Sequence, residues 1–214
     1  MATISLGGFS AVAAPVGTLG TLSTPFFPGD GNSNTNFIID VNRFEGIEIG
    51  IKAKASFQGD VPFENMAYQA VAGESDPGLA TWNVDFSFNF GASTIDDYSV
   101  LLLLDFDPAV GSTPASLLVN ANPAVAGLSL VQDSQNLGFP FFQALGNPNI
   151  QAFDPFAVGE YEIGIQVFNL DDELVAEVSS LVNVSNVPVP AALPLLAFGI
   201  GGLVFLGRKR RAKA

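Results

Sequence analysis

The stretch TWNVDFSFNF, residues 81–90, alternates large apolar side chains with polar ones at every second position. The apolar members are Trp82, Val84, Phe86, Phe88 and Phe90, and the polar members are Asn83, Asp85, Ser87 and Asn89. Because successive side chains of a β-strand point to opposite faces of a sheet, this pattern predicts a half-buried antiparallel strand. Burial contributes roughly 1.5–3 kcal/mol for each large apolar side chain, so we expect this strand to lie in the core.

Further strands are predicted on both sides of this one. Residues 46–57 place Ile47, Ile49, Ile51, Ala53, Ala55 and Phe57 on one side and Glu48, Lys52, Lys54 and Ser56 on the other. Residues 160–169 alternate in the same way, and the apolar run at 99–107 predicts a strand covered on both faces. Weaker candidates are residues 36–42, 115–121, 127–133 and 173–184.

The segments between these candidates are rich in turn-forming residues, and the chain holds 22 Gly and 14 Pro. Many short strands separated by turns are typical of a two-sheet fold. The sequence therefore predicts an all-β protein, a two-sheet antiparallel β-sandwich over residues 15–184. Jelly-roll and immunoglobulin-like topologies both remain open.

Composition restricts the chemistry of the chain. It contains no Cys and no His, which excludes thiolate nucleophiles, Ser-His-Asp triads and the usual zinc sites. Residues 1–186 carry three basic and 21 acidic side chains, a net charge of −18, whereas the last 28 residues carry five basic ones. A body this acidic repels the phosphate backbone of nucleic acids, so no nucleic-acid partner is expected.

The carboxyl-terminal segment, residues 185–214, differs from the rest of the chain. Residues 191–206 contain no charged side chain, and Arg208, Lys209, Arg210 and Arg211 follow them. A helix over residues 187–207 would be about 30 Å long, close to the thickness of a bilayer's hydrocarbon core. The segment therefore predicts a single transmembrane helix, and the basic cluster predicts that its end stays in the cytoplasm with the acidic body on the far side.

The residues that introduce this helix carry a family resemblance. The order Val187, Pro188, Val189, Pro190 and Ala191, then the glycine-rich apolar span and the basic cluster, resembles the VPLPA variant of the PEP-CTERM protein-sorting signal. Val189 stands where that variant usually has Leu, and the resemblance covers about residues 187–214.

The resemblance implies an exported protein of a Gram-negative bacterium. Such a protein is held briefly in the inner membrane, cut near residues 188–191 by an exosortase-type membrane protease, and delivered to the cell surface or extracellular matrix, where it is associated with exopolysaccharide and biofilm. Export needs a signal peptide. The small residues Ala11, Ala13 and Ala14 are consistent with residues 1–14 being the remnant of one, although a first strand explains them equally well.

Candidate sites in the body are few. Asp105 and Asp107 follow the apolar run at 99–104 and could share a calcium ion, although a solvated strand end is the simpler interpretation. No cofactor and no catalytic residue is expected, so the sequence favours a non-enzymatic envelope protein. Two alternatives remain, a secreted carbohydrate-binding module or glycoside hydrolase with the same tail, and a permanent single-pass membrane protein. Trp82 or the phenylalanines could stack on sugars, but their alternation favours burial in the core.

Overall fold

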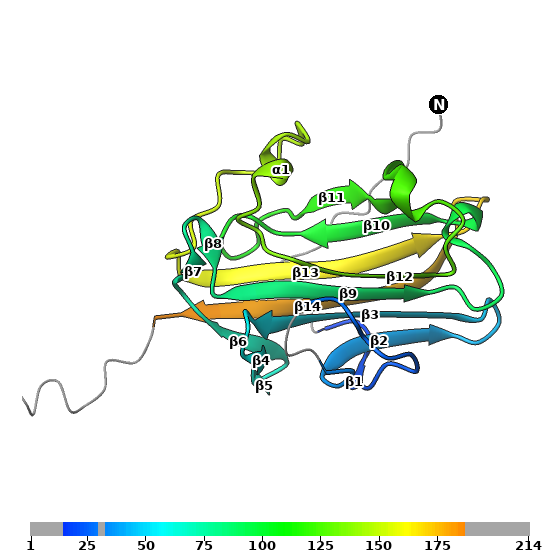
Figure 1. The fold of residues 1–214 in the computed structure, drawn as a ribbon, viewed down its shortest axis with the longest axis horizontal. Helices are drawn as coiled ribbons and strands as arrows, with labels where there is room; N and C mark the ends of the chain where they lie inside the picture. Colours follow the sequence, from blue (N-terminus) through cyan, green and yellow to red (C-terminus); the bar gives the residue numbers. More distant parts are fainter. Residues whose placement is uncertain (1–14, 30–32, 187–214) are drawn as a thin grey trace, which may run out of the picture.

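The computed structural model describes residues 15–29 and 33–186. Within them the regular secondary structure is mostly β-strand, which confirms the all-β prediction (Figure 1). The described helical elements are one turn of α-helix, α1 (Pro140–Gln143), and three short 3-10 turns, η1 (Ile95–Asp97), η2 (Val119–Ala121) and η3 (Pro123–Val125).

Two six-stranded sheets form the body. The first sheet has the order β1-β2-β3-β9-β12, with β4 also paired to β3. Its strands are β1 (Thr18–Gly20), β2 (Phe37–Asn42), β3 (Ile47–Ala55), β4 (Gly59–Asp60), β9 (Trp82–Asn89) and β12 (Leu130–Gln135). The predicted core strand is therefore β9, which lies between β3 and β12.

The second sheet has the order β11-β10-β13-β14-β6-β5. Its strands are β5 (Phe63–Glu64), β6 (Ala67–Val71), β10 (Ser99–Leu104), β11 (Ala115–Leu118), β13 (Gly159–Phe168) and β14 (Leu174–Ser185). A separate small ribbon pairs β7 (Glu74–Asp76) with β8 (Leu79–Ala80). The pairing of β14 with β6 is parallel, so the prediction of purely antiparallel sheets was wrong at this position.

The core lies between the two sheets. It contains Trp82, Phe86 and Phe88 from the first sheet and Tyr161 and Ile163 from the second, all buried. The rings of Trp82 and Tyr161 lie 5.5 Å apart, which joins the sheets through an aromatic contact. Burial of Trp82 and the β9 phenylalanines confirms that they pack in the core and are not presented for stacking on a sugar.

The other predicted strands form with shifted ends. In β10 the residues from Val100 to Leu104 are all buried, which confirms a strand covered on both faces. Strand β3 ends at Ala55, and Phe57 lies in the following turn with φ +60° and 70% of its surface exposed. The assignment of Phe57 to the apolar face of that strand was therefore wrong.

Candidate functional site

Part of the outer face of the first sheet is covered, although the sequence pattern of β9 predicted a half-buried strand. The residues that lie over it are 21–29 and 33–36, which we call the covering segment. Leu22 and Phe26 of this segment pack with Phe37 and Ile39 of β2 as a second small core. Gly50 of β3 makes the close packing possible, because a Cβ atom there would lie 2.7 Å from Leu22 Cδ2.

Beneath the covering segment lies a cluster of buried charged residues that sequence reasoning missed. Lys52 and Lys54 of β3 and Asp85 of β9 are at most 2% exposed. Lys52 stands opposite Asp85 in the register of the two strands. The sequence signal for this burial was Gly50, a glycine on the polar side of an otherwise regular strand.

Lys52 is satisfied by a cage of oxygen atoms. Its Nζ donates to Asp60 Oδ1 at 2.6 Å and to the carbonyl oxygens of Ser33 at 2.9 Å and Thr35 at 3.4 Å. The ammonium also lies 4.6 Å from the centre of the Phe37 ring, a cation–π contact. Lys52 therefore fastens the covering segment to the sheet.

Asp60 completes this cage from β4. Its Oδ2 accepts hydrogen bonds from Ser33 Oγ at 2.7 Å and Asn36 Nδ2 at 3.1 Å. Burial raises the pKa of Asp60, but the hydrogen bonds and the positive charge of Lys52 outweigh burial, so the pKa lies below its ordinary value. Asp60 is therefore ionised at neutral pH and balances the charge of Lys52.

Asp85 has a less favourable environment. Within the described residues, neither of its carboxylate oxygens makes a hydrogen bond of regular geometry. Burial raises the pKa of Asp85 to about 6, and the nearby Ser134 hydroxyl and the charges of Lys54 and Lys52 offset only part of that shift. A carboxyl with a raised pKa is often catalytic, but this one is 0% exposed, so substrate has no access to it.

The predicted pair Asp105 and Asp107 lies in the loop that follows β10. Asp105 is buried and accepts hydrogen bonds from the Ser112 hydroxyl and the Asp107 backbone N–H. Asp107 accepts from the Ala109 backbone N–H at 3.0 Å and from Gln151 Nε2 at 3.2 Å. Burial raises the pKa of Asp105. Both carboxylates thus organise the loop, and calcium binding by them stays a prediction.

No cluster of three or more potential metal-ligating side chains occurs in the described ranges 15–29 and 33–186. In the same ranges, no helix is long and apolar enough to cross a membrane. The predicted sorting motif, residues 187–191, and the basic cluster, residues 208–211, lie outside the described residues.

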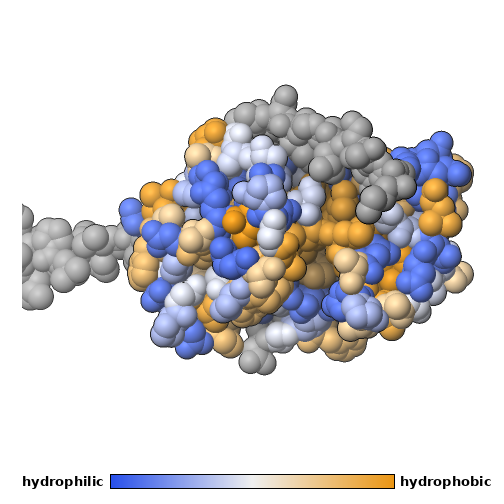
Figure 2. Space-filling view, turned by 90° about the horizontal axis from the view of Figure 1, so that it is seen from above, coloured by the Kyte–Doolittle hydropathy of each residue, from blue (hydrophilic) through white to orange (hydrophobic). Residues whose placement is uncertain are grey.

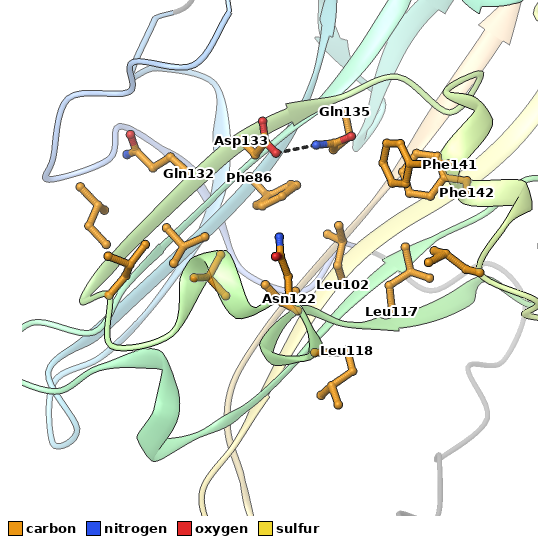
Figure 3. A pocket seen from close by; sticks show the side chains of 17 residues that line it. Phe86, Leu102, Leu117, Leu118, Asn122, Gln132, Asp133, Gln135, Phe141 and Phe142 are labelled. Carbon is orange, nitrogen blue, oxygen red and sulfur yellow. Dashed lines mark hydrogen bonds between the residues drawn. The ribbon is translucent and has the colours of Figure 1, made fainter.

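A groove lies on the open side between the two sheets (Figure 3). Its volume is about 580 Å³, and it runs between edge strand β12 and edge strand β11. Phe86 of the first sheet and Leu102 of the second form its buried floor. The turns η2 and η3 border one end, and Phe141 and Phe142 of α1 border the other.

The groove is mostly apolar, with polar groups from β12. Val131, Asp133 and Gln135 stand opposite Phe88, Phe86 and Val84 of β9, so their side chains share the inner face of the first sheet. Figure 2 views the molecule from the side that carries α1 and β11, and apolar surface is visible in a hollow between polar patches. A concave apolar site with a few polar groups is the usual form of a small-molecule site, so this groove is the candidate functional site.

Comparisons with known proteins give little. No protein-family model and no curated protein matches the chain. Among solved structures, the soluble domain of PmoD from Methylocystis sp. (strain Rockwell) is similar over 69% of this chain and 96% of its own, with 8% identity and a TM-score of 0.31. A likeness of this size carries no argument about fold or function.

Proposed function

We propose that this chain is an exported, non-enzymatic protein of the cell envelope or extracellular matrix, delivered by a removable sorting tail. In this proposal residues 187–191 are cut by an exosortase-type membrane protease, and the apolar span after them is a transient membrane helix. The body lies on the periplasmic side before release to the cell surface or matrix, where exopolysaccharide is the expected partner.

The observation that carries the proposal is where the folded body ends. Strand β14 ends at Ser185, two residues before Val187. Cutting within residues 188–191 would therefore leave every described strand and the core intact. The prolines Pro188 and Pro190 disfavour helix before the span, which suits the extended form in which proteases bind their substrates.

The roles of the acidic side chains are consistent with a body that carries out no reaction. Asp60 holds Lys52 under the covering segment, and Asp105 and Asp107 hold the loop after β10. Asp85 is inaccessible. Asp60, Asp105 and Asp107 thus have structural roles, and the burial of Asp85 keeps it from a substrate, which supports the proposal of a non-enzymatic body.

The direct test is the mass of the protein recovered from its native cells. We expect a product that lacks the residues after the sorting motif. An intact carboxyl terminus in mature cell fractions would instead show a permanent single-pass membrane protein. Incubating the protein with the polysaccharide of its host tests the other alternative, because a binding module would be retained and a hydrolase would shorten the polymer.

A further inference from the structure

The groove between β12 and β11 carries an inference that does not depend on the sorting tail. We propose that it binds an amphipathic small molecule, with an alkyl chain in the groove and a head group that donates hydrogen bonds and carries no negative charge. The argument rests on the shape, the lining and the charge of the groove.

The shape fits one small molecule. A volume of about 580 Å³ lies within the range of roughly 300–1,000 Å³ that is typical of ligand pockets. The six residues of β12 give the groove a length of about 20 Å, at about 3.4 Å per residue. Because η2 and η3 border one end and α1 the other, the groove suits a short ligand better than a peptide strand that continues past both ends.

The lining favours an alkyl chain. Phe86, Leu102, Val131 and Phe142 are buried along the groove. At its rim Leu118, Leu128, Phe141 and Leu145 are between 43% and 53% exposed. A ligand that covers these exposed apolar side chains removes their surface from water, which favours binding.

Besides Asn122, whose Oδ1 accepts from the Ala124 backbone N–H, the polar residues of the groove lie on β12, and the Asp133 carboxylate among them is an acceptor. Gln135 Nε2 donates to Asp133 Oδ2 at 2.5 Å, which fixes the orientation of the amide. Gln135 Oε1 is then a buried oxygen without a hydrogen-bond partner among the described residues. An oxygen this buried is out of reach of a ligand in the groove, so the acceptor that a ligand hydroxyl or ammonium group can reach is the carboxylate of Asp133, an exposed residue of the lining.

Charge excludes an acidic head group. Asp133 is the one charged residue among those that line the groove, and the body around it has a net charge of −18. A carboxylate or phosphate would be repelled. An inward-pointing charge on an edge strand also hinders pairing with other chains, which explains Asp133 but not the apolar hollow beside it.

The test uses the full chain in lipid nanodiscs and an octyl glucoside analogue with a photoreactive group at the end of its alkyl chain, kept below its micelle concentration. We expect label on peptides that contain residues 117–145, and peptide mapping separates it from label on the tail. Unmodified octyl glucoside should compete, whereas octanoate and glucose should not. Competition by octanoate or glucose at equal strength, or no label on these peptides, would overturn the proposal.

Variants connect the label to the groove. Leu117→Trp fills the groove and should reduce labelling at least tenfold, and Leu118→Trp at the more exposed rim provides the same test with less risk to folding. The matched control is Val110→Trp, a 70% exposed position that does not line the groove. Asp133→Asn should make octanoate a competitor. Unchanged labelling in both filled variants would also overturn the proposal.

Discussion

Lys52 and Asp85 stand opposite each other on β3 and β9, and both side chains are 0% exposed. Lys52 donates its closest hydrogen bond to Asp60 at 2.6 Å, not to Asp85. Asp85 is thus a buried carboxyl whose charge the neighbouring Lys54 and Lys52 compensate only in part. Burying an ionised group without full compensation is costly, so the ionised form of Asp85 lowers the stability of the fold.

Replacing Asp85 with Asn should stabilise the protein at neutral pH. The folded pKa of about 6 lies above the ordinary value of 3.8, so the folded state binds the proton more tightly than the unfolded state. The Asp85 contribution to stability therefore falls as pH rises from about 4 to about 6, and Asp85→Asn removes this loss. This difference between the folded and the ordinary pKa corresponds to a gain in the free energy of unfolding of roughly 3 kcal/mol for Asp85→Asn above pH 6.

Urea unfolding followed by the fluorescence of Trp82, the one tryptophan of the chain, measures this effect. At pH 7.5 Asp85→Asn should have the higher free energy of unfolding, and at pH 3.5 the two proteins should be nearly equal. Asp76→Asn, at an exposed position of β7, is the control and should show no such pH-dependent gain. Equal stabilities at both pH values would refute the role assigned to Asp85.

The two partners of the buried salt bridge should respond differently to removal. Asp60→Ala leaves the Lys52 ammonium buried and should destabilise the protein by about 3 kcal/mol. Lys52→Met removes the buried charge and leaves Asp60, which is 20% exposed, so a loss of about 1 kcal/mol is expected. Unfolding in urea at pH 7 should give this order, and the double variant should be more stable than Asp60→Ala. The reverse order would contradict the cage described for Lys52.

The ion pair between Lys52 and Asp60 also predicts that the protein loses stability at low pH. Because the pKa of Asp60 is lower in the folded state, its contribution is present above the ordinary carboxyl range and is lost as pH falls through the folded value. The stability difference between the natural protein and Asp60→Ala should therefore shrink below about pH 4. A difference that stays constant down to pH 2 would indicate that the Asp60 charge contributes nothing.

A methyl group at Gly50 should loosen the covering segment. Its Cβ would lie 2.7 Å from Leu22 Cδ2 and 3.3 Å from Phe37 Cδ1, so Leu22 has to move away from the sheet. Gly50→Ala should cost about 1–2 kcal/mol, as overpacking of cores usually does, and should speed limited proteolysis within residues 21–36. Val41→Ala, at a half-exposed position of neighbouring β2, should leave cleavage there unchanged.

The sorting proposal predicts a processing defect. Replacing Pro188 and Pro190 with Ala removes the restriction on helix before the apolar span, so the site should be a poorer protease substrate. Membrane fractions should then contain full-length protein, detected by its mass. Val184→Ala, inside β14, serves as the control and should still be processed. Mature-sized protein in the proline variant would refute the role of the motif.

Alternation and apolar runs in the sequence were enough to find the longer strands and the inner core, but they missed β1 and the short strands β4 to β8. The period of two at residues 82–90 and 160–167 identified β9 and β13, and the unbroken apolar run at 100–104 identified a strand buried on both faces. These signals depend on neighbouring residues of one strand, because each strand presents its own pattern to the core. Burial between the sheets was therefore predictable.

The covered outer face and the groove were not predictable in this way. In a half-exposed strand the positions of Lys52, Lys54 and Asp85 would face water. Their burial depends on the covering segment, which lies 16 to 64 residues earlier in the chain. The groove depends on β12 and β11 being edges of different sheets. Both features depend on contacts between segments that are far apart in the sequence. The periodicity of a single strand cannot predict such contacts.

The parallel pairing of β14 with β6 joins residues 181–185 to residues 67–71. Five strands of the second sheet, β5, β6, β10, β11 and β13, are synthesised before β14, yet β14 lies between β13 and β6. The second sheet therefore cannot be completed during translation until β14, at the end of the body, has been synthesised. Under the proposed export, this delay would keep the chain unfolded for passage through a narrow translocation channel.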